Sequence, residues 1–120
     1  MNKVIGIIGS RRRNSFKDYK KVFIKVMEIY KKGDSFVSGG CPKGADNFAE
    51  KIAMEKNIPI TIYKAEWDKY GKVAGFFRNT YIADDADVLI ACVAKDRKGG
   101  TEDTIKKYTK TFKKKKLFLV

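Results

Sequence analysis

Short apolar runs alternate along the chain with stretches whose apolar residues recur at helical spacing. The runs cover residues 3–9, 35–39, 58–63, 87–94 and 116–120, and the run at 87–94 is the most apolar. A nearly continuous apolar run of this length is typical of a strand that is buried on both faces. The pattern therefore predicts about five strands, with the strand at 87–94 near the centre of the sheet.

The stretches between these runs predict helices, because their apolar residues return every third or fourth position. Helices are expected over residues 15–32, 43–56, 76–85 and 101–111, and a longer connection over 64–75. Ser15 and Asp18 have the spacing of a capping box at the start of the first helix, and Gly33 is suited to its end.

The alternation of strands and helices predicts an α/β fold in which right-handed crossovers build a mainly parallel sheet. With 120 residues and no evident linker or repeat, the chain is expected to form a single domain, residues 1–120. The expected architecture is Rossmann-like, with three layers and helices on both faces of the sheet. Such folds bind ligands beyond the carboxyl ends of the strands, where the strand order switches.

Glycine-rich or charged stretches follow four of the predicted strands. They are GSRRRNS (9–15), SGGCPKGAD (38–46), AEWDKYGKVAGFFRN (65–79) and AKDRKGGTED (94–103). Because the carboxyl ends of parallel strands share one edge of the sheet, these stretches are expected to meet at one rim. Their convergence predicts a binding site there.

Within the second stretch, Gly39, Gly40 and Gly44 lead from a strand into a helix. Amides at a helix N-terminus, together with the helix dipole, form an anion site, and glycine lets a phosphate or ribose approach the backbone. Asp46, in the first turn, can cap amides or accept hydrogen bonds from sugar hydroxyls. The alternative is a tight structural turn with Asp46 as its cap.

The arginines of GSRRRNS and the glycines of KGGTED are further candidates for holding an anion. Ser10 and Arg11 are the first residues beyond the strand, and a guanidinium is a two-pronged donor suited to phosphate. Arg12 and Arg13 are interpreted as surface charge. Thr101 is expected to be the N-cap of the last helix.

Aromatic and polar side chains stand out in the third stretch. Trp67 and Tyr70 can stack on a base or pack against the sheet edge. Arg78 and Asn79 are polar residues among apolar neighbours, and they either contact the ligand or form a structural hydrogen-bond network.

Composition narrows the chemistry further. The chain has no histidine and only two cysteines, Cys41 and Cys92, so a Cys/His zinc site and histidine-based catalysis are excluded, and no metal or cofactor is expected. No apolar run reaches the roughly 18 residues that span a membrane, and the first residues are too short in their apolar part for a secretion signal. A cytoplasmic protein with no membrane partner is expected.

The formal net charge is +13, and residues 95–116 alone carry +7. A basic face can bind nucleic acid, so DNA or RNA is a secondary candidate partner through this segment. The alternative is a lysine-rich surface that serves solubility, because nearly all of the excess is lysine.

Five motifs in order, G-S-R, V-S-G-G-x-x-x-G-A-D, W-x-x-Y-G-K-x-A-G-x-x-R-N, A-D-x-L-I-A and G-G-T, resemble the YspA-like branch of the SLOG (Smf/DprA–LOG) superfamily. The resemblance covers residues 5–105. It implies a Rossmann-like domain that binds a nucleotide or nucleotide-derived molecule, such as an ADP-ribose-like or signal nucleotide. The ligand contacts it implies are Gly9, Ser10, Arg11, Ser38, Gly39, Gly40, Gly44, Asp46, Trp67, Tyr70, Gly71, Lys72, Gly75, Arg78, Asn79, Gly99, Gly100 and Thr101.

LOG-type relatives hydrolyse an N-glycosidic bond with a P-G-G-x-G-T-x-x-E signature, where this chain has K-G-G-T-E-D. The first expectation is therefore binding, for sensing or sequestration, in keeping with a phage or mobile-element protein. Hydrolysis of a nucleotide is the alternative, with Glu66, Asp46 and Glu102 as candidate carboxylates. Partly apolar helix faces also predict a homo-oligomer.

Overall fold

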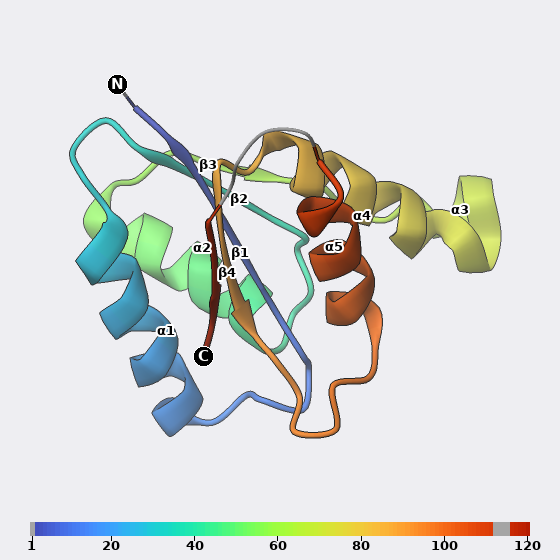
Figure 1. Cartoon of the computed structure of the whole chain (residues 1–120), viewed down its shortest axis with the longest axis horizontal. Coiled ribbons are helices and arrows are strands. Elements are labelled where there is room, and N and C mark those ends of the chain that lie inside the picture. The colour runs from blue at the N-terminus through green and yellow to red at the C-terminus, as the bar shows by residue number, and fades with distance from the viewer. Residues whose placement is uncertain (1, 112–115) are drawn as a thin grey trace.

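A five-stranded sheet forms the centre of the protein in the computed structural model, which describes residues 2–111 and 116–120 (Figure 1). The strands are β1 (Val4–Gly9), β2 (Ser35–Ser38), β3 (Ile60–Ile62), β4 (Val88–Cys92) and β5 (Lys116–Leu119). Their order is β3-β2-β1-β4-β5, and every pair is parallel. The predicted α/β fold is confirmed, with β1 as the middle strand and β4 beside it.

Helices cover both faces of the sheet, so the domain has the three predicted layers. They are α1 (Phe16–Ile29), α2 (Ala45–Lys56), α3 (Trp67–Tyr70), α4 (Ala74–Asp85) and α5 (Gly100–Thr109), with a 3-10 turn, η1 (Gly71–Val73), between α3 and α4. In Figure 1, α1 and α2 lie on one side of the sheet, α4 and α5 lie on the other, and α3 projects beyond the sheet edge.

The alternation of side chains along the central strands divides the core in two. In β1, Ile5 and Ile7 pack with α1 and α2, whereas Ile8 packs with α4 and α5. In β4, Ile90 packs on the side of α1 and α2, and Leu89 packs on the side of α4 and α5. Successive strand residues point to opposite faces, so continuous apolar runs are what a doubly covered sheet requires.

The first helix begins as predicted and ends earlier. The Ser15 hydroxyl accepts the amide of Asp18, and the Asp18 carboxylate accepts the amide of Ser15, which confirms the capping box. The helix stops at Ile29 rather than at residue 32. The Asp34 carboxylate explains the difference, because it accepts the Lys31 amide at 2.8 Å and holds the following turn against the sheet.

The expected connection at 64–75 is largely helical, which corrects the prediction. Its one-turn helix α3 and the turn η1 lead directly into α4, which begins two residues before the expected Phe76. Gly75 made a helix look unfavourable at this point. In the structure, the Trp67 ring lies 3.4 Å from the place that a Cβ of Gly75 would occupy, an ordinary van der Waals contact, so the packing of α3 on α4 does not require this glycine.

Candidate functional site

A pocket of about 490 Å³ opens where the strand order changes direction. The chain builds β2 and β3 on one side of β1 and then returns to place β4 on the other side. The pocket lies at the ends of β1 and β4, and residues directly after β1 and directly before α5 line it. This is the position at which open parallel sheets bind their ligands.

Many of the predicted site residues line this pocket, which we call the rim pocket. They are Gly9, Ser10, Arg11, Asp46, Trp67, Arg78, Asn79, Gly99, Gly100 and Thr101. The lining also includes residues that were not predicted as ligand contacts: Ile8, Arg12, Cys41, Ile82, Lys98 and Thr104. Apolar helix and strand positions such as Ile8 and Ile82 carry no signal of this role, because their spacing marks them only as core.

The N-terminus of α5 gives the rim pocket its clearest anion-binding feature. Gly99, with φ +119°, is the N-cap, so the expectation that Thr101 caps this helix is wrong. The first amides of a helix have no acceptor one turn earlier, and here they belong to Gly100, Thr101 and Glu102. The Glu102 amide bonds the carbonyl oxygen of Gly99 at 3.2 Å, and the amides of Gly100 and Thr101 have no acceptor among the described residues. Apart from neighbouring residues and the backbone of the helix itself, no described atom lies within 4 Å of an added Cβ at Gly99 or Gly100, and both glycines line the rim pocket.

The three successive arginines after β1 have different environments. Arg12 pairs with Asp96 across the rim, and Arg13 pairs with Asp18 and reaches the carbonyl oxygen of Val93. Arg11 lines the rim pocket, and within residues 2–111 and 116–120 it forms no ion pair or side-chain hydrogen bond. Arg11 is therefore the guanidinium available to an anion.

The glycine-rich stretch after β2 has the structural role predicted as the alternative, a tight turn in which the Asp46 carboxylate accepts a backbone amide. The Gly44 amide donates to Oδ1 of Asn14 at 2.8 Å, and the Cys41 amide donates to Oδ2 of Asp46 at 3.1 Å. Gly44, with φ +77°, also lies against the backbone of Ser10, where a Cβ would be 2.6 Å from the carbonyl oxygen. These two amides are therefore already used, and the stretch reaches the wall of the pocket only through Cys41 and Asp46.

Asp46 lies in this wall and is 7% exposed. The Ser38 hydroxyl lies 2.6 Å from the carbonyl oxygen of Ile7 and 3.1 Å from Oδ1 of Asp46. A hydroxyl has one proton, so both contacts are hydrogen bonds at once only when Asp46 is protonated and donates to Ser38. Burial raises the pKa of Asp46, while the Cys41 amide, the Arg78 guanidinium and Ser38 lower it by less.

Arg78 and Asn79 connect the loop after β2 to the start of α5 through hydrogen bonds. Arg78 donates from Nη1 to the carbonyl oxygen of Gly39 at 2.7 Å and from Nε to Oδ1 of Asn79 at 2.9 Å. The Asn79 side chain, 6% exposed, donates to Oδ2 of Asp103 at 3.1 Å and contacts the carbonyl oxygen of Gly100 at 3.3 Å. The network predicted as one alternative for this pair is present, and Arg78 also lines the pocket.

The remaining predicted residues lie around this centre. Ser38, Gly39, Gly40 and Gly44 are outside the pocket lining, as is Lys72. Trp67 lines the rim pocket and is 54% exposed, so its ring is accessible to a ligand.

The three candidate carboxylates are not brought together. Glu66 lines a separate pocket with Tyr70, and Glu102 pairs with Arg97. Asp46 alone lines the rim pocket, and its oxygens are already in contact with Ser38 and Cys41.

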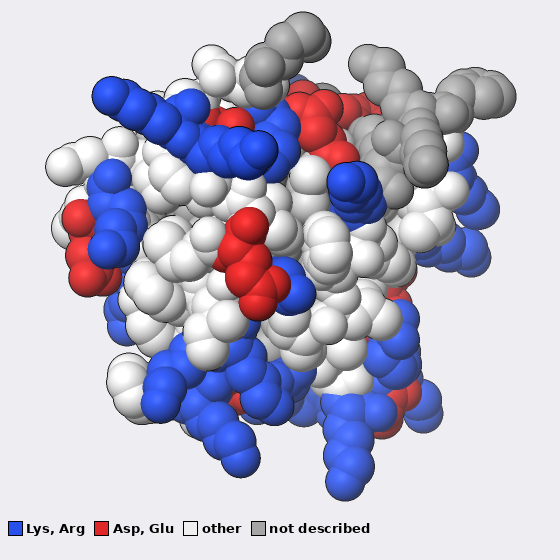
Figure 2. All heavy atoms as spheres, turned by 60° about the vertical axis from the view of Figure 1, so that its left-hand side comes forward, with Lys and Arg blue, Asp and Glu red and all other residues white. Residues whose placement is uncertain are grey.

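Positive charge surrounds the rim. Lys and Arg side chains gather along the lower edge of the face in Figure 2, the edge toward which β4 points in Figure 1. In the described part of the chain, no group of three or more Cys, Asp or Glu side chains is placed to hold a metal, and no helix has the length and apolarity needed to cross a membrane. The lysines at 113–115, part of the predicted basic segment, lie outside the described residues.

Comparisons with protein-family models, with curated proteins and with solved structures found no match. The resemblance to the SLOG superfamily therefore stays a prediction, and the case for function depends on the geometry of the rim.

Proposed function

We propose that this protein binds a phosphate-bearing, nucleotide-like small molecule in the rim pocket and thereby senses or sequesters it. The observation that supports this most is that the N-terminus of α5 at Gly99–Thr101 lines the same pocket as the guanidinium of Arg11, which has no side-chain partner among the described residues. Free amides and an uncompensated cation attract a phosphate from two sides.

The phosphate is proposed to lie at α5 rather than at α2. The amides of Cys41 and Gly44, just before α2, are already bonded to Asp46 and Asn14, and of the first turn of α2 only Asp46 lines the rim pocket, whereas Gly99, Gly100 and Thr101 all line it. Lys98 and Arg11 add positive charge beside α5. This assignment moves the anion site from the glycine-rich stretch after β2 to the one after β4.

The base is proposed to lie against Trp67. Its exposed indole lines the same pocket, and aromatic stacking contributes about 1–3 kcal/mol per base. A volume of about 490 Å³ is within the range of small-molecule sites.

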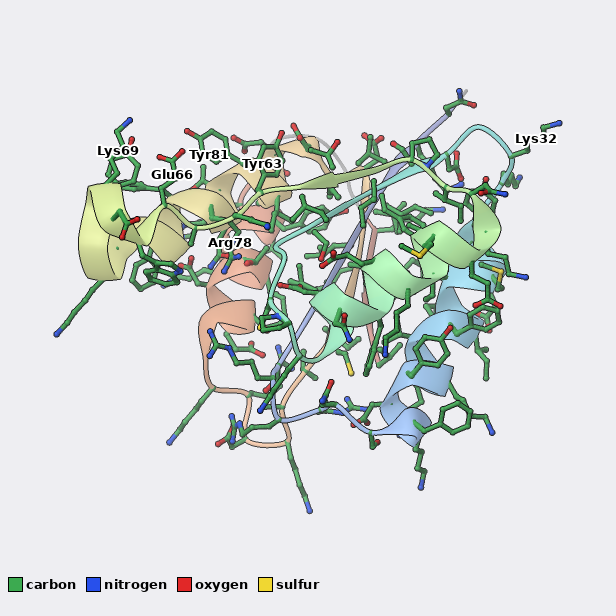
Figure 3. All side chains as sticks on the ribbon, turned by 180° about the vertical axis from the view of Figure 1, so that it is seen from behind. Lys32, Tyr63, Glu66, Lys69, Arg78 and Tyr81 are labelled. Atoms are coloured by element: carbon green, nitrogen blue, oxygen red, sulfur yellow. The ribbon has the colours of Figure 1, made fainter. Side chains whose placement is uncertain are left out.

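Calorimetric titration with ADP, ADP-ribose and adenosine tests the proposal. ADP and ADP-ribose are expected to bind, and adenosine to bind at least tenfold more weakly, because it lacks the phosphates. Arg11→Gln should weaken ADP binding about tenfold. Lys32→Gln is the control, because Lys32 is exposed at the end of the molecule far from Arg78 (Figure 3). Absence of binding by both phosphate compounds at millimolar concentration would reject the proposal.

Hydrolysis of the ligand is less well supported by the arrangement of the carboxylates. Glu102 is engaged by Arg97, and Glu66 belongs to the other pocket, so neither lies among the residues that line the rim pocket. Nucleic-acid binding and self-association stay predictions. Intact ADP after prolonged incubation would agree with a binding role, and release of free adenine would favour hydrolysis.

A further inference from the structure

A second pocket lies on the other side of Arg78 from the rim pocket. It has a volume of about 560 Å³, and residues from the end of β3, from α3 and from α4 form its walls. Arg78 lines both pockets, so the two are neighbours that share one side chain. In Figure 3, Lys69, Glu66, Tyr81 and Tyr63 lie along the upper left edge of the molecule, and Arg78 lies below them.

The walls of this second pocket are rich in aromatic rings. Tyr63 and Tyr81 are stacked, with ring centroids 5.4 Å apart and planes at 25°, and Tyr70 and Phe77 meet edge to face at 4.7 Å. Tyr81 is 57% exposed, and Phe77 and Tyr70 are also exposed. We call this the tyrosine pocket. Exposed ring faces beside a cavity are suited to stack on a planar ring.

A hydrogen bond to Asp85 holds one ring of the stacked pair, Tyr63, in place. The Tyr63 hydroxyl donates to Oδ2 of Asp85, and that hydrogen bond, with burial, raises the pKa of Tyr63. Tyr63 therefore presents a fixed, uncharged surface on which Tyr81 stacks.

Positive charge is also present around these rings. Lys64, Lys69 and Arg78 line the tyrosine pocket, and Glu66 is the only acid among the lining residues of this pocket. Lys69 lies over the Tyr70 ring, with Nζ 5.1 Å from its centroid. A planar group attached to an anion fits this combination better than a neutral apolar one.

Arg78 has donors left for such an anion. Its Nη1 and Nε atoms bond Gly39 and Asn79, while Nη2 forms no hydrogen bond with the described residues. A guanidinium carries five N–H donors, two of them on Nη2. An anionic group at Arg78 can therefore bond this side chain without breaking the network that holds it.

We propose that the tyrosine pocket receives the second base of a two-headed ligand. The bridging phosphates extend from the N-terminus of α5 to Arg78, to which Asn79 connects it by hydrogen bonds, while one base lies in the rim pocket and the other stacks in the tyrosine pocket. The class of ligand is a dinucleotide with an aromatic base at each end. This inference rests on the proposed function of the rim pocket, and it adds the requirement for a second ring.

Calorimetry with ADP and with diadenosine diphosphate, which has the same two phosphates and one more nucleoside, tests the inference. Diadenosine diphosphate is expected to bind with a stoichiometry of one and at least tenfold more tightly than ADP, because a second base stacks. Tyr81→Ala should remove this advantage and leave ADP affinity unchanged, whereas Tyr81→Phe should retain it. Phe16→Ala is the control, because Phe16 is an exposed aromatic residue on α1, across the sheet.

The outcomes separate this inference from the function on which it rests. Failure of both compounds to bind would reject the rim-pocket proposal and this inference together. Equal affinity of the two compounds, or an advantage that Tyr81→Ala leaves intact, would overturn this inference alone. Two equivalents of ADP per chain with no gain for diadenosine diphosphate would also overturn it, because the pockets would then be independent sites.

Discussion

Arg78 donates a hydrogen bond to the carbonyl oxygen of Gly39 across 2.7 Å, and it occupies the space in which any larger residue at position 39 would place its Cβ. That Cβ would lie 2.6 Å from Nη1 of Arg78 and 2.8 Å from Oδ2 of Asp46. Gly39 thus serves the site by letting a guanidinium and a carboxylate approach the backbone. The sequence predicted that a ligand would approach the backbone at Gly39, and in the structure these two side chains do so.

Gly39→Ala should therefore displace the Arg78 and Asp46 side chains and break their hydrogen bonds. We expect the free energy of unfolding to fall by about 1–2 kcal/mol, measured by urea denaturation. Gly100→Ala is the control, because nothing lies within 4 Å of the added Cβ. Equal stability of the two variants would show that Arg78 does not depend on the bare backbone at Gly39.

Gly100→Pro tests the anion site at α5 separately from stability. Gly100 is the first residue of the helix, where proline is tolerated, and the substitution removes one amide donor without adding or removing charge. We expect ADP affinity to fall about tenfold while the melting temperature stays near that of the native protein. Gly100→Ala keeps the amide and should bind ADP normally. If both variants bind alike, the phosphate does not use this amide.

The two buried aspartates should affect acid stability in opposite directions. Burial alone would raise the pKa of Asp34, but hydrogen bonds from Lys3 and the Lys31 amide outweigh it, so the pKa lies below 3.8. Asp34 therefore stabilises the fold above the unfolded pKa of about 3.9, and this contribution is lost as the pH falls through its folded pKa. For Asp46 the folded pKa is raised, so its contribution is full below about pH 3.9 and is lost as the pH rises through the folded value.

Chemical denaturation of Asp34→Asn and Asp46→Asn between acid and neutral pH measures both effects. The rise in unfolding free energy from acid to neutral pH should become smaller in Asp34→Asn and larger in Asp46→Asn. A change of the same sign in both variants would contradict the assignment of one lowered and one raised pKa.

Ser15→Ala should destabilise the protein by about 1 kcal/mol, because it removes the acceptor for the Asp18 amide at the start of α1. Ser15→Thr keeps a hydroxyl in the same place and should lose only part of this. The comparison uses thermal unfolding of the ligand-free protein. Indistinguishable melting temperatures for the alanine variant and the native chain would argue that the capping box contributes nothing.

Local signals were sufficient for the elements and for much of the rim. The capping box of Ser15 was read directly from two residues, and Arg11 and Gly100 were placed at the rim because they follow strands of a parallel sheet. The helical nature of residues 67–75 was missed, because Gly71 and Gly75 lower helix propensity and the 4 residues of α3 are too few to show a helical spacing of apolar positions.

The amino-acid sequence by itself determined the alternation of strands and helices, and hence the parallel sheet and the edge at which its loops meet, because hydrophobic spacing reports burial along each element. Only the tertiary structure decided which of the similar groups remain available to a ligand. The Gly44 amide donates a hydrogen bond to Asn14, and Arg12 forms an ion pair with Asp96. Arg11 has no such side-chain partner among the described residues. Hydrogen-bond partners that lie far apart in the chain cannot be recognised from the sequence around either residue, because folding sets the distance between them.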